Sequence, residues 1–296
     1  MNPIIKVVSA LRYVANHPAN RDRKVRAVME YGFIQIAARI VPGDVCVKFP
    51  NSTRLLVSPH MKGAAHFITP PLCEFEDMAF VMHFLRPEET FCDVGANIGA
   101  FSVLASGVTG AKSIAFEPSP ETFEMLQCNI RLNNLTSRVR TMQAVVGGQI
   151  GTAQFSSGLG TENYVTKSAG EKTVAVPMTT LDHELATTPA TVLKVDVEGF
   201  ETEVFSGGKQ TLQNPALLAL IVERNGSGNR YGYDEAALHT EIRSCGFKPH
   251  SYAPFTRTLH PIGDNDVGNI IYIRDFTTVY ERLRSAPSFQ IGSLKV

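Results

Sequence analysis

The chain of 296 residues lacks an excess of charge of either sign, because 28 basic residues are matched by 28 acidic ones. A broad basic face for nucleic acid or an anionic membrane is therefore not indicated, although a local patch is compatible with this total. The chain also lacks an apolar run of the roughly 18 residues that a membrane span needs. We find no internal repeats and no low-complexity segment. We expect a globular protein with no nucleic-acid partner and no membrane span.

Paired cysteines are missing as well. The five cysteines are scattered and show no CxxC pair or other metal-type spacing: Cys46, Cys73, Cys92, Cys128 and Cys245. We expect reduced thiols and no metal site. Apolar residues recur at helical spacing over residues 1–24, but charged residues interrupt them and no small-residue cleavage site follows. We therefore expect a cytoplasmic protein.

The first third of the chain has a pattern of its own. Up to about residue 39 it is helical and basic, and it includes the run RDRKVR at 21–26. We interpret that run as a solvated helix face, with a functional basic patch as the alternative. Residues 44–68 alternate as in a small antiparallel unit, and residues 70–85 return to helical spacing. We predict a helical and antiparallel cap over residues 1–86.

After Pro87 short apolar strands alternate with helical segments. Strands are expected at 90–94, 113–117, 139–146, 191–197 and 217–223, and helices at 120–133 and 200–207. This alternation predicts a parallel sheet with helices on both faces, in a domain over 87–296. A helix over 234–245 is followed by the segments 247–253 and 269–274, with no helix of comparable length between them. They fit an antiparallel hairpin at the sheet edge.

The first of these strands runs into a glycine-containing turn and then a helix, which is the outline of a nucleotide-binding loop. Glu117 closes the next strand, where a carboxylate can accept hydrogen bonds from both ribose hydroxyls. In Gly95-Ala96-Asn97-Ile98-Gly99, however, Asn97 replaces the glycine that admits a pyrophosphate in GxGxxG. Asp93, at the strand end, would repel a diphosphate and favour a cation. S-Adenosylmethionine, with a ribose, an ammonium and a sulfonium but no phosphate, matches this loop better.

A second constellation lies in TVLKVDVEGFETEVFSGG, residues 191–208. The two-residue period of a strand places Lys194, Asp196 and Glu198 on one face and apolar residues on the other. Aligned charges would be costly in a core, so we expect them at the mouth of a site. The alternative is that Glu198 and Glu201 only flank the start of the next helix, where negative charge is favourable.

Three motifs in this order and spacing resemble the FkbM family of S-adenosylmethionine-dependent methyltransferases: FCDVGANIGAFSVLAS, SIAFEPSPETFEMLQCNIRLNNL and VLKVDVEGFETEVFSGG. The resemblance covers about residues 87–224, with weaker similarity in VCVKFPNSTRLLVSP. It implies a class I methyltransferase fold, with a seven-stranded, mostly parallel sheet and helices on both faces. It also implies O-methylation of a hydroxylated small molecule, a sugar or another natural product, but it does not identify the acceptor or the oligomeric state.

Carried over by position, the resemblance implies a complete cofactor site. Its members are Asp93, Gly95, Asn97 and Gly99 around the methionine part, Glu117 on the ribose, Pro118, Ser119, Gln143 and Ala144 beside the adenine, and Asp196 beside the methyl group. The acidic residue expected after the third strand is missing from AVVGGQIG, so the adenine contacts are the least constrained.

Methyl transfer to an alcohol benefits from a general base. The candidates are Asp196 and Glu198, with Glu223 as a third acid at the same sheet edge and with His60 and His66 of the cap in reserve. A metal held by these carboxylates is an alternative, but no histidine stands at ligand spacing to them. Residues 225–235, rich in glycine and aromatics, are interpreted as a mobile loop on the acceptor side.

Two other functions stay open at this point. One is a nicotinamide-dependent oxidoreductase, which Asp93 and the missing glycine disfavour. The other is a non-catalytic nucleotide-binding module, which the acids at the site mouth disfavour.

Overall fold

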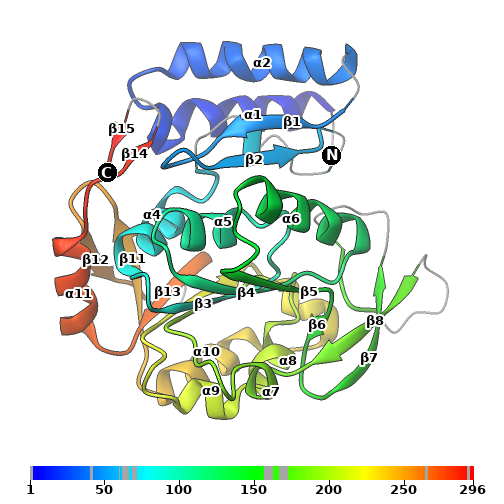
Figure 1. Ribbon diagram of the computed structural model, residues 1–296, viewed down its shortest axis with the longest axis vertical. Coiled ribbons are helices and arrows are strands. Elements are labelled where there is room, and N and C mark those ends of the chain that lie inside the picture. The colour runs from blue at the N-terminus through cyan, green and yellow to red at the C-terminus, as the bar shows by residue number, and fades with distance from the viewer. Residues whose placement is uncertain are drawn as a thin grey trace.

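A mixed β-sheet runs through the centre of the computed structural model, which describes residues 3–40, 43–59, 61, 67–68, 72–156, 163–166, 173–263, 266–291 and 294–296 (Figure 1). Within these residues the strand order is β12-β11-β13-β10-β9-β3-β4-β5. The strands are β3 (Thr90–Val94), β4 (Lys112–Phe116), β5 (Val139–Met142), β9 (Val192–Val195), β10 (Ala219–Arg224), β11 (Lys248–Ala253), β12 (Thr258–Pro261) and β13 (Gly268–Ile273).

The strand directions confirm the predicted sheet. From β10 to β5 all neighbours are parallel, whereas β13, β11 and β12 continue the sheet by antiparallel pairing. Seven of these strands have the expected mostly parallel arrangement with an antiparallel hairpin at one end. The described sheet has an eighth strand because the segment between β11 and β13 folds back as β12 at the edge.

Helices cover both faces of the sheet, as the sequence predicts (Figure 1). On one side lie α4 (Phe75–Phe84), α5 (Ala100–Gly107) and α6 (Pro120–Leu132), and on the other α7 (Leu181–Glu184), α8 (Glu201–Ser206), α9 (Lys209–Gln213) and α10 (Glu235–Ser244). Along β9, Val192 belongs to one hydrophobic core and Leu193 and Val195 to the other. Burial on both faces explains why these strands are continuous apolar runs in the sequence.

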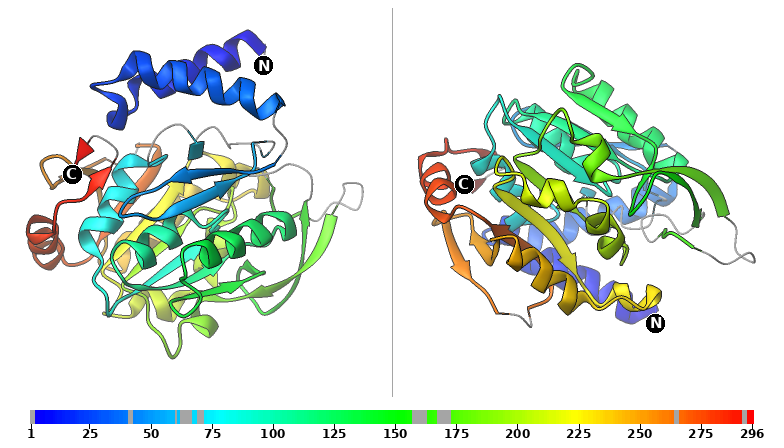
Figure 2. Two further views of the ribbon diagram at one scale, coloured as in Figure 1. Left: turned by 45° about the horizontal axis from the view of Figure 1, so that its top comes forward. Right: turned by 90° about the horizontal axis from the view of Figure 1, so that it is seen from below.

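The N-terminal elements form a layer above α6. They are α1 (Pro3–Asn16), the short η1 (Pro18–Asn20), α2 (Lys24–Ile40) and the hairpin of β1 (Val45–Lys48) with β2 (Arg54–Val57) (Figures 1 and 2). The Asn129 side chain of α6 bonds both the N–H and the C=O of Leu56, at 2.6 and 3.0 Å, and Asn133 bonds Arg54 in the same way. These amides satisfy the free edge of β2. The division of the chain at residue 87 stays a prediction.

One predicted strand is wrong in its extent. The segment 139–146 divides into β5 of the main sheet and β6 (Val145–Val146), which pairs with β8 (Thr173–Thr179) in a separate sheet. β7 (Gly151–Ser156) completes that sheet, which projects to one side of the molecule (Figure 1). Nothing in the segment 139–146 marks this division, although β6 is buried throughout whereas β5 buries only Val139.

The C-terminal elements were not expected from the sequence. Helix α11 (Phe276–Ser285) packs against α4 and β12, and the chain ends in a short hairpin of β14 (Gln290–Ile291) and β15 (Leu294–Lys295).

Candidate functional site

A cavity of about 520 Å³ opens at the carboxyl ends of β3, β4, β9 and β10. Ligands of open α/β sheets bind at this edge, where the strand order reverses. Here the reversal falls between β3 and β9, since the chain runs outward from β3 to β5 and then returns to β9 on the other side. The cavity is therefore where the sequence places the site.

The turn from β3 to α5 shapes one wall of the cavity. Gly95 has a φ of +82°, and a Cβ at this position would lie 1.8 Å from the carbonyl oxygen of Asp196. Asn97 also adopts a left-handed φ, of 52°, and its side-chain oxygen accepts from the N–H of Ile98 at 2.8 Å. Only glycine fits at position 95, so the turn lies directly against the end of β9.

Every backbone N–H of this turn is used within the protein. Gly95 and Ala96 both donate to the carbonyl of Phe116, at 3.0 and 2.9 Å, and Gly99 donates to Ala96 at 2.8 Å. Asn97 donates to the Glu117 carboxylate at 3.0 Å. With Ile98 bonded to the Asn97 side chain, residues 95–99 offer no free N–H for a phosphate.

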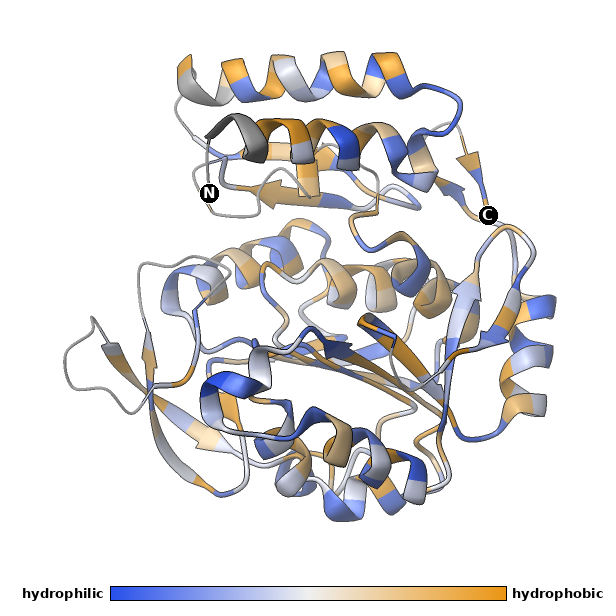
Figure 3. Ribbon diagram, turned by 180° about the vertical axis from the view of Figure 1, so that it is seen from behind, coloured by the Kyte–Doolittle hydropathy of each residue, from blue (hydrophilic) through white to orange (hydrophobic). Residues whose placement is uncertain are grey.

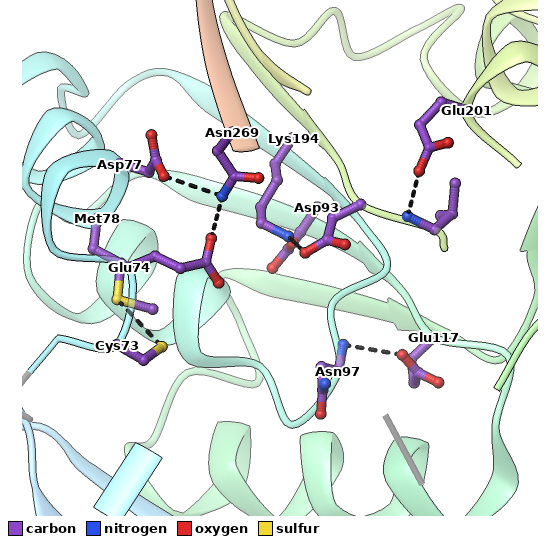
Figure 4. A network of polar contacts seen from close by, with 12 residues as sticks. Cys73, Glu74, Asp77, Met78, Asp93, Asn97, Glu117, Lys194, Glu201 and Asn269 are labelled. Atoms are coloured by element: carbon purple, nitrogen blue, oxygen red, sulfur yellow. Dashed lines mark hydrogen bonds and ion pairs between the residues drawn. The ribbon is translucent and has the colours of Figure 1, made fainter. Parts of the chain in front are cut away.

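Glu117 is the buried acid that follows β4. One of its oxygens accepts from the N–H of Asn97 (Figure 4), and the other accepts from the N–H of Ser119 at 2.9 Å, so the carboxylate is fixed against the turn. Burial raises the pKa of Glu117 to about 7, and the two backbone donors oppose this rise. Since each oxygen accepts only one of these bonds, lone pairs remain for the hydroxyls of a ligand in the cavity.

Polar side chains form a row across the sheet on the side of α4 and α5 (Figure 4). Asp93 of β3 lies opposite Lys194 of β9, and Glu223 of β10 lies opposite Asn269 of β13. The Lys194 ammonium donates to Asp196 at 2.8 Å and lies 4.9 Å from the ring centre of Phe101. The expectation of a mouth position is wrong for Lys194, which is buried, although it still lines the cavity.

The acids around Lys194 explain how a buried ammonium is tolerated. Burial alone would lower its pKa, but the carboxylates of Asp196, Glu74 and Asp93 raise it above the usual value. Asp93 accepts from the Ser102 hydroxyl at 2.7 Å, and burial raises its pKa against the effect of Lys194. Asp93 is fully buried and does not line the cavity. In the described structure it is a partner of Lys194 and of α5.

The turn after β9 carries three further acids. Asp196 and Glu198 line the cavity, and Glu198 has a left-handed φ of 56°. Glu201 accepts from the N–H groups of Val197 and Gly199, at 3.1 and 3.2 Å, and thus holds the turn closed. The alternative, that Glu198 and Glu201 only flank the start of the next helix, therefore describes Glu201, whereas Glu198 lines the cavity. Asp196 also lines the cavity and accepts from Lys194.

Glu223 lines the same end of the cavity. One of its oxygens is buried without a hydrogen-bond partner among the described residues. Burial raises the pKa of Glu223, and the nearby charges of Asp196 and Glu198 raise it further. A protonated Glu223 can donate a hydrogen bond to an acceptor molecule.

The sequence analysis missed Glu74 of the cap. This residue precedes α4 and lines the cavity, and its carboxylate accepts from Asn269 at 2.5 Å. The same amide group of Asn269 donates to Asp77 at 3.0 Å, so that two carboxylates share one donor (Figure 4). Burial raises the pKa of Asp77 to about 8, helped by the charge of Glu74. Glu74 comes from a segment with no motif, and only the tertiary packing of α4 brings it to the site.

The insertion that follows β5 supplies a second missed group. Phe155 of β7, together with Asn163 and Val165, lines the cavity. The Tyr231 hydroxyl donates to the carbonyl of Val165 at 2.9 Å, and its ring packs edge-on against Phe200. This Tyr231 lies in η3 (Ser227–Tyr231), within the segment 225–235 that we predict to be a mobile loop. The segment forms a 3₁₀ turn that contacts the insertion through Tyr231, and its mobility stays a prediction.

The predicted site residues, the cofactor residues together with the catalytic candidate Glu198, divide into two groups. Those that line the cavity are Gly95, Asn97, Glu117, Pro118, Ala144, Asp196 and Glu198. Those that do not are Asp93, Gly99, Ser119 and Gln143. Gly99 begins α5 with a φ of +87°, and Ser119 begins α6, so both build the walls from behind. The roles of all these residues stay predictions. His60 and His66 lie outside the described residues.

The described residues contain neither a metal-type cluster nor a membrane-type helix. No group of three or more His, Cys, Asp or Glu side chains in this part of the chain is arranged to hold a metal ion. Within the same ranges, no helix combines the length and apolar character that crossing a bilayer demands.

Comparison with known proteins bears on the family. Residues 93–249, more than half of the chain, match the family described as methyltransferase FkbM domain. The hexuronic acid methyltransferase AglP of Haloferax volcanii is 31% identical over 130 residues, which are 43% of this chain and 53% of that protein. The methyltransferase sdnD of Sordaria araneosa is 34% identical over 79 residues, 26% of this chain and 30% of that protein. The chain thus spans about half or less of the length of these relatives.

Solved structures are more distant in sequence. The methyltransferase FkbM from Methylobacillus flagellatus KT is 17% identical, with a TM-score of 0.45, over 64% of this chain and 44% of that one. A transferase from Pyrococcus horikoshii, PH0793, is 12% identical, with a TM-score of 0.43, over 83% and 84% of the two chains.

Proposed function

Because the chain belongs to the FkbM methyltransferase family, we propose that it transfers the methyl group of S-adenosylmethionine to a hydroxyl of a sugar or natural-product acceptor. One observation carries the choice of cofactor. All backbone N–H groups of residues 95–99 are bonded within the protein, one of them to the Glu117 carboxylate. A pyrophosphate would find no donor in this turn and would meet a negative charge, whereas a ribose without phosphate meets neither obstacle.

The residues present fit this cofactor. Glu117 would hold the ribose, Gly95 and Asn97 the methionine part, and Pro118 and Ala144 would border the adenine. The backbone of Gly95 lies so close to Asp196 that no side chain fits at this position of the turn. The bound cofactor supplies an activated methyl group on a sulfonium, which is a good leaving group.

The chain's own residues would orient the acceptor and take up its proton. An alcohol is a weak nucleophile until it loses its proton, and a carboxylate within hydrogen-bond reach can accept it. Asp196 and Glu198 both line the cavity beside the turn of Gly95. The Lys194 ammonium fixes Asp196 from behind, and the walls formed by Phe155, Phe200 and Val165 would exclude water. The name of AglP, a hexuronic acid methyltransferase, supports a sugar as acceptor.

Two measurements test the proposal. Titration calorimetry should show binding of S-adenosylhomocysteine in the micromolar range and no binding of NADH. Transfer of labelled methyl from S-adenosylmethionine to a hydroxylated acceptor should then be detected by profiling extracts of small molecules. Saturable NADH binding would favour an oxidoreductase. S-Adenosylhomocysteine binding with no transfer to any acceptor would leave only a binding module.

A matched pair of variants tests the assignment of the base. If Asp196 is the base, Asp196→Asn should lower the single-turnover rate by at least about a hundredfold, while Glu198→Gln should leave it near the parental value. Asp196→Asn also removes the charged partner of a buried ammonium, so we expect a loss of roughly 1 to 3 kcal/mol in unfolding free energy. Parental rates in both variants would contradict a role for either acid.

A further inference from the structure

Helix α2 presents an apolar stripe to the surroundings. Val25, Met29, Phe33, Ile36 and Ile40 are each between 60 and 76% exposed. Their spacings of four, four, three and four residues place them on one side of the helix, opposite Ala27 and α1. Figures 1 and 3 show α2 as the outermost element of the N-terminal layer, with apolar residues along its whole length. Single exposed apolar side chains are ordinary, but a continuous stripe marks an interaction surface.

Basic residues accompany this stripe. The first 40 residues contain seven Lys and Arg but only two acidic residues, although the whole chain is neutral. At 100° per residue, Arg26 lies about 60° from the centre of the stripe and borders it, whereas Lys24 lies about 140° away, on the side of Ala27. Arg21 precedes the helix, and all three residues are exposed. Within the run RDRKVR, which the catalytic site does not use, Arg26 therefore borders the apolar face and Arg21 lies just before it.

The acids of this region are engaged within the same chain. Glu30 accepts from Arg23 at 2.8 Å and from Arg26 at 2.9 Å, and Asp22 pairs with Arg21 at 3.3 Å. These pairs engage the basic residues too, but residues 21–30 hold four basic side chains against two acidic ones, a net charge of +2. A second copy of the chain docked along the same end of the stripe would therefore bring two net-positive surfaces together. An anionic surface would complement them. A helix with an apolar stripe and basic borders lies in the plane of a lipid interface, with its apolar side chains below the headgroups.

We propose that the exposed face of α2 docks the protein onto an anionic lipid surface. The apolar stripe enters the interface, and Arg21 and Arg26 contact the headgroups. This surface lies on α2, above the hairpin of β1 and β2, and shares no residue with the catalytic cavity (Figure 2). Docking is therefore separate from the proposed methyl transfer, and it can fail without affecting that proposal.

Vesicle co-sedimentation of the full chain tests this inference. We expect the protein to sediment with vesicles of equal parts phosphatidylcholine and phosphatidylglycerol, weakly or not at all with phosphatidylcholine alone, and less at high salt. The double variant Met29→Ser/Phe33→Ser should partition at least tenfold more weakly, because burying each apolar side chain contributes roughly a factor of ten or more. Ile150→Ser is the matched control: Ile150 is 63% exposed and precedes β7, away from α2.

Circular dichroism and binding of S-adenosylhomocysteine establish that the variants are folded. Should the double variant misfold, Arg21→Gln/Arg26→Gln takes its place and should weaken binding to the anionic vesicles alone. The inference is overturned if the parent does not bind anionic vesicles at low salt, or if neither double variant weakens that binding. A parent that forms a dimer dissociated by Met29→Ser/Phe33→Ser, without vesicle binding, would show that a second copy covers the stripe.

Discussion

Glu117 combines a structural and a binding role in one carboxylate. Its two backbone bonds hold the turn of residues 95–99, and its remaining lone pairs face the cavity. Removal of a charged acceptor of two ribose hydrogen bonds should cost roughly 1.5 to 3 kcal/mol. We expect Glu117→Ala to bind S-adenosylhomocysteine some tenfold to a hundredfold more weakly in calorimetry. Glu121→Ala, which removes an exposed acid at the start of α6, should bind as the parent does.

The pKa of Glu117 adds a pH dependence to this prediction. Burial raises that pKa to about 7 in the free protein, so the carboxyl becomes protonated as the pH falls below this value. A protonated carboxyl accepts hydroxyl hydrogen bonds poorly, and the parental affinity should decline from pH 8 to pH 6. The Glu117→Ala variant should lose this decline. If Glu117→Ala binds S-adenosylhomocysteine as tightly as the parent does at both pH values, the assignment of Glu117 to the ribose is refuted.

The site residues near the glycine turn could be predicted from sequence, because the backbone conformation of the turn restricts which residue types fit at each position. Gly95, Asn97 and Glu117 occupy fixed positions in a strand, turn and helix unit, and all three line the cavity. Glu74 could not be found in this way, since it is 43 residues from Glu117 in sequence and reaches the site only by the packing of α4. The burial of Lys194 was also misjudged, because sequence periodicity shows which face a residue shares but not which groups surround it.

At the scale of elements, the turn after β3 packs so closely against the end of β9 that residue 95 has no room for a side chain. A Cβ on residue 95 would lie 1.8 Å from the Asp196 carbonyl oxygen, at a positive φ. Gly95→Ala must therefore push β9 away from β3, and we expect a more than tenfold loss of S-adenosylhomocysteine affinity together with a lower Tm. Gly246→Ala provides the matched control, because residue 246 has a φ of +90° but no atom within 4 Å of the place that an added methyl group would take.

The two variants separate strain from collision. Backbone strain at a positive φ costs roughly 1 kcal/mol in both, so any further loss in Gly95→Ala measures the displacement of β9. Equal Tm losses and intact cofactor affinity in both variants would mean that the turn and β9 move independently.

The elements themselves were predictable where local pattern and tertiary environment agree. β3 has the expected bounds, and α6 and α10 each differ from expectation by a residue at one or both ends. The sheet of β6, β7 and β8 was not predictable, because only two residues separate β5 from β6 and the segment 139–146 holds no Gly, Pro, Asn, Asp or Ser to mark where the chain changes sheets. The sequence analysis therefore also missed three residues that line the cavity: Phe155, Asn163 and Val165.

At the scale of the whole molecule, several carboxyl groups are buried in the folded protein, and burial changes their pKa. Burial raises the pKa of Glu117 to about 7 and of Asp77 to about 8, and it raises that of Glu223 as well. In the unfolded chain these groups ionise near pH 4. Between about pH 6.5 and pH 9 the folded protein thus binds more protons than the unfolded one, and its stability falls as the pH rises. His83 does not interfere, since burial lowers its pKa to about 4 and both states are neutral over most of this range.

We therefore expect the Tm of the ligand-free protein to fall by roughly 5 to 10 °C between about pH 6.5 and pH 9, as a loss of a few kcal/mol implies. Asp77→Asn keeps an acceptor for Asn269 but cannot ionise, so its Tm should match the parent near pH 6.5 and exceed it near pH 9. Asp44→Asn, at an exposed position, should follow the parent throughout. Differential scanning calorimetry across this range decides the matter: a parental Tm that stays level or rises would mean that these carboxyls are ionised in the folded protein, with Lys194 and solvent compensating their burial.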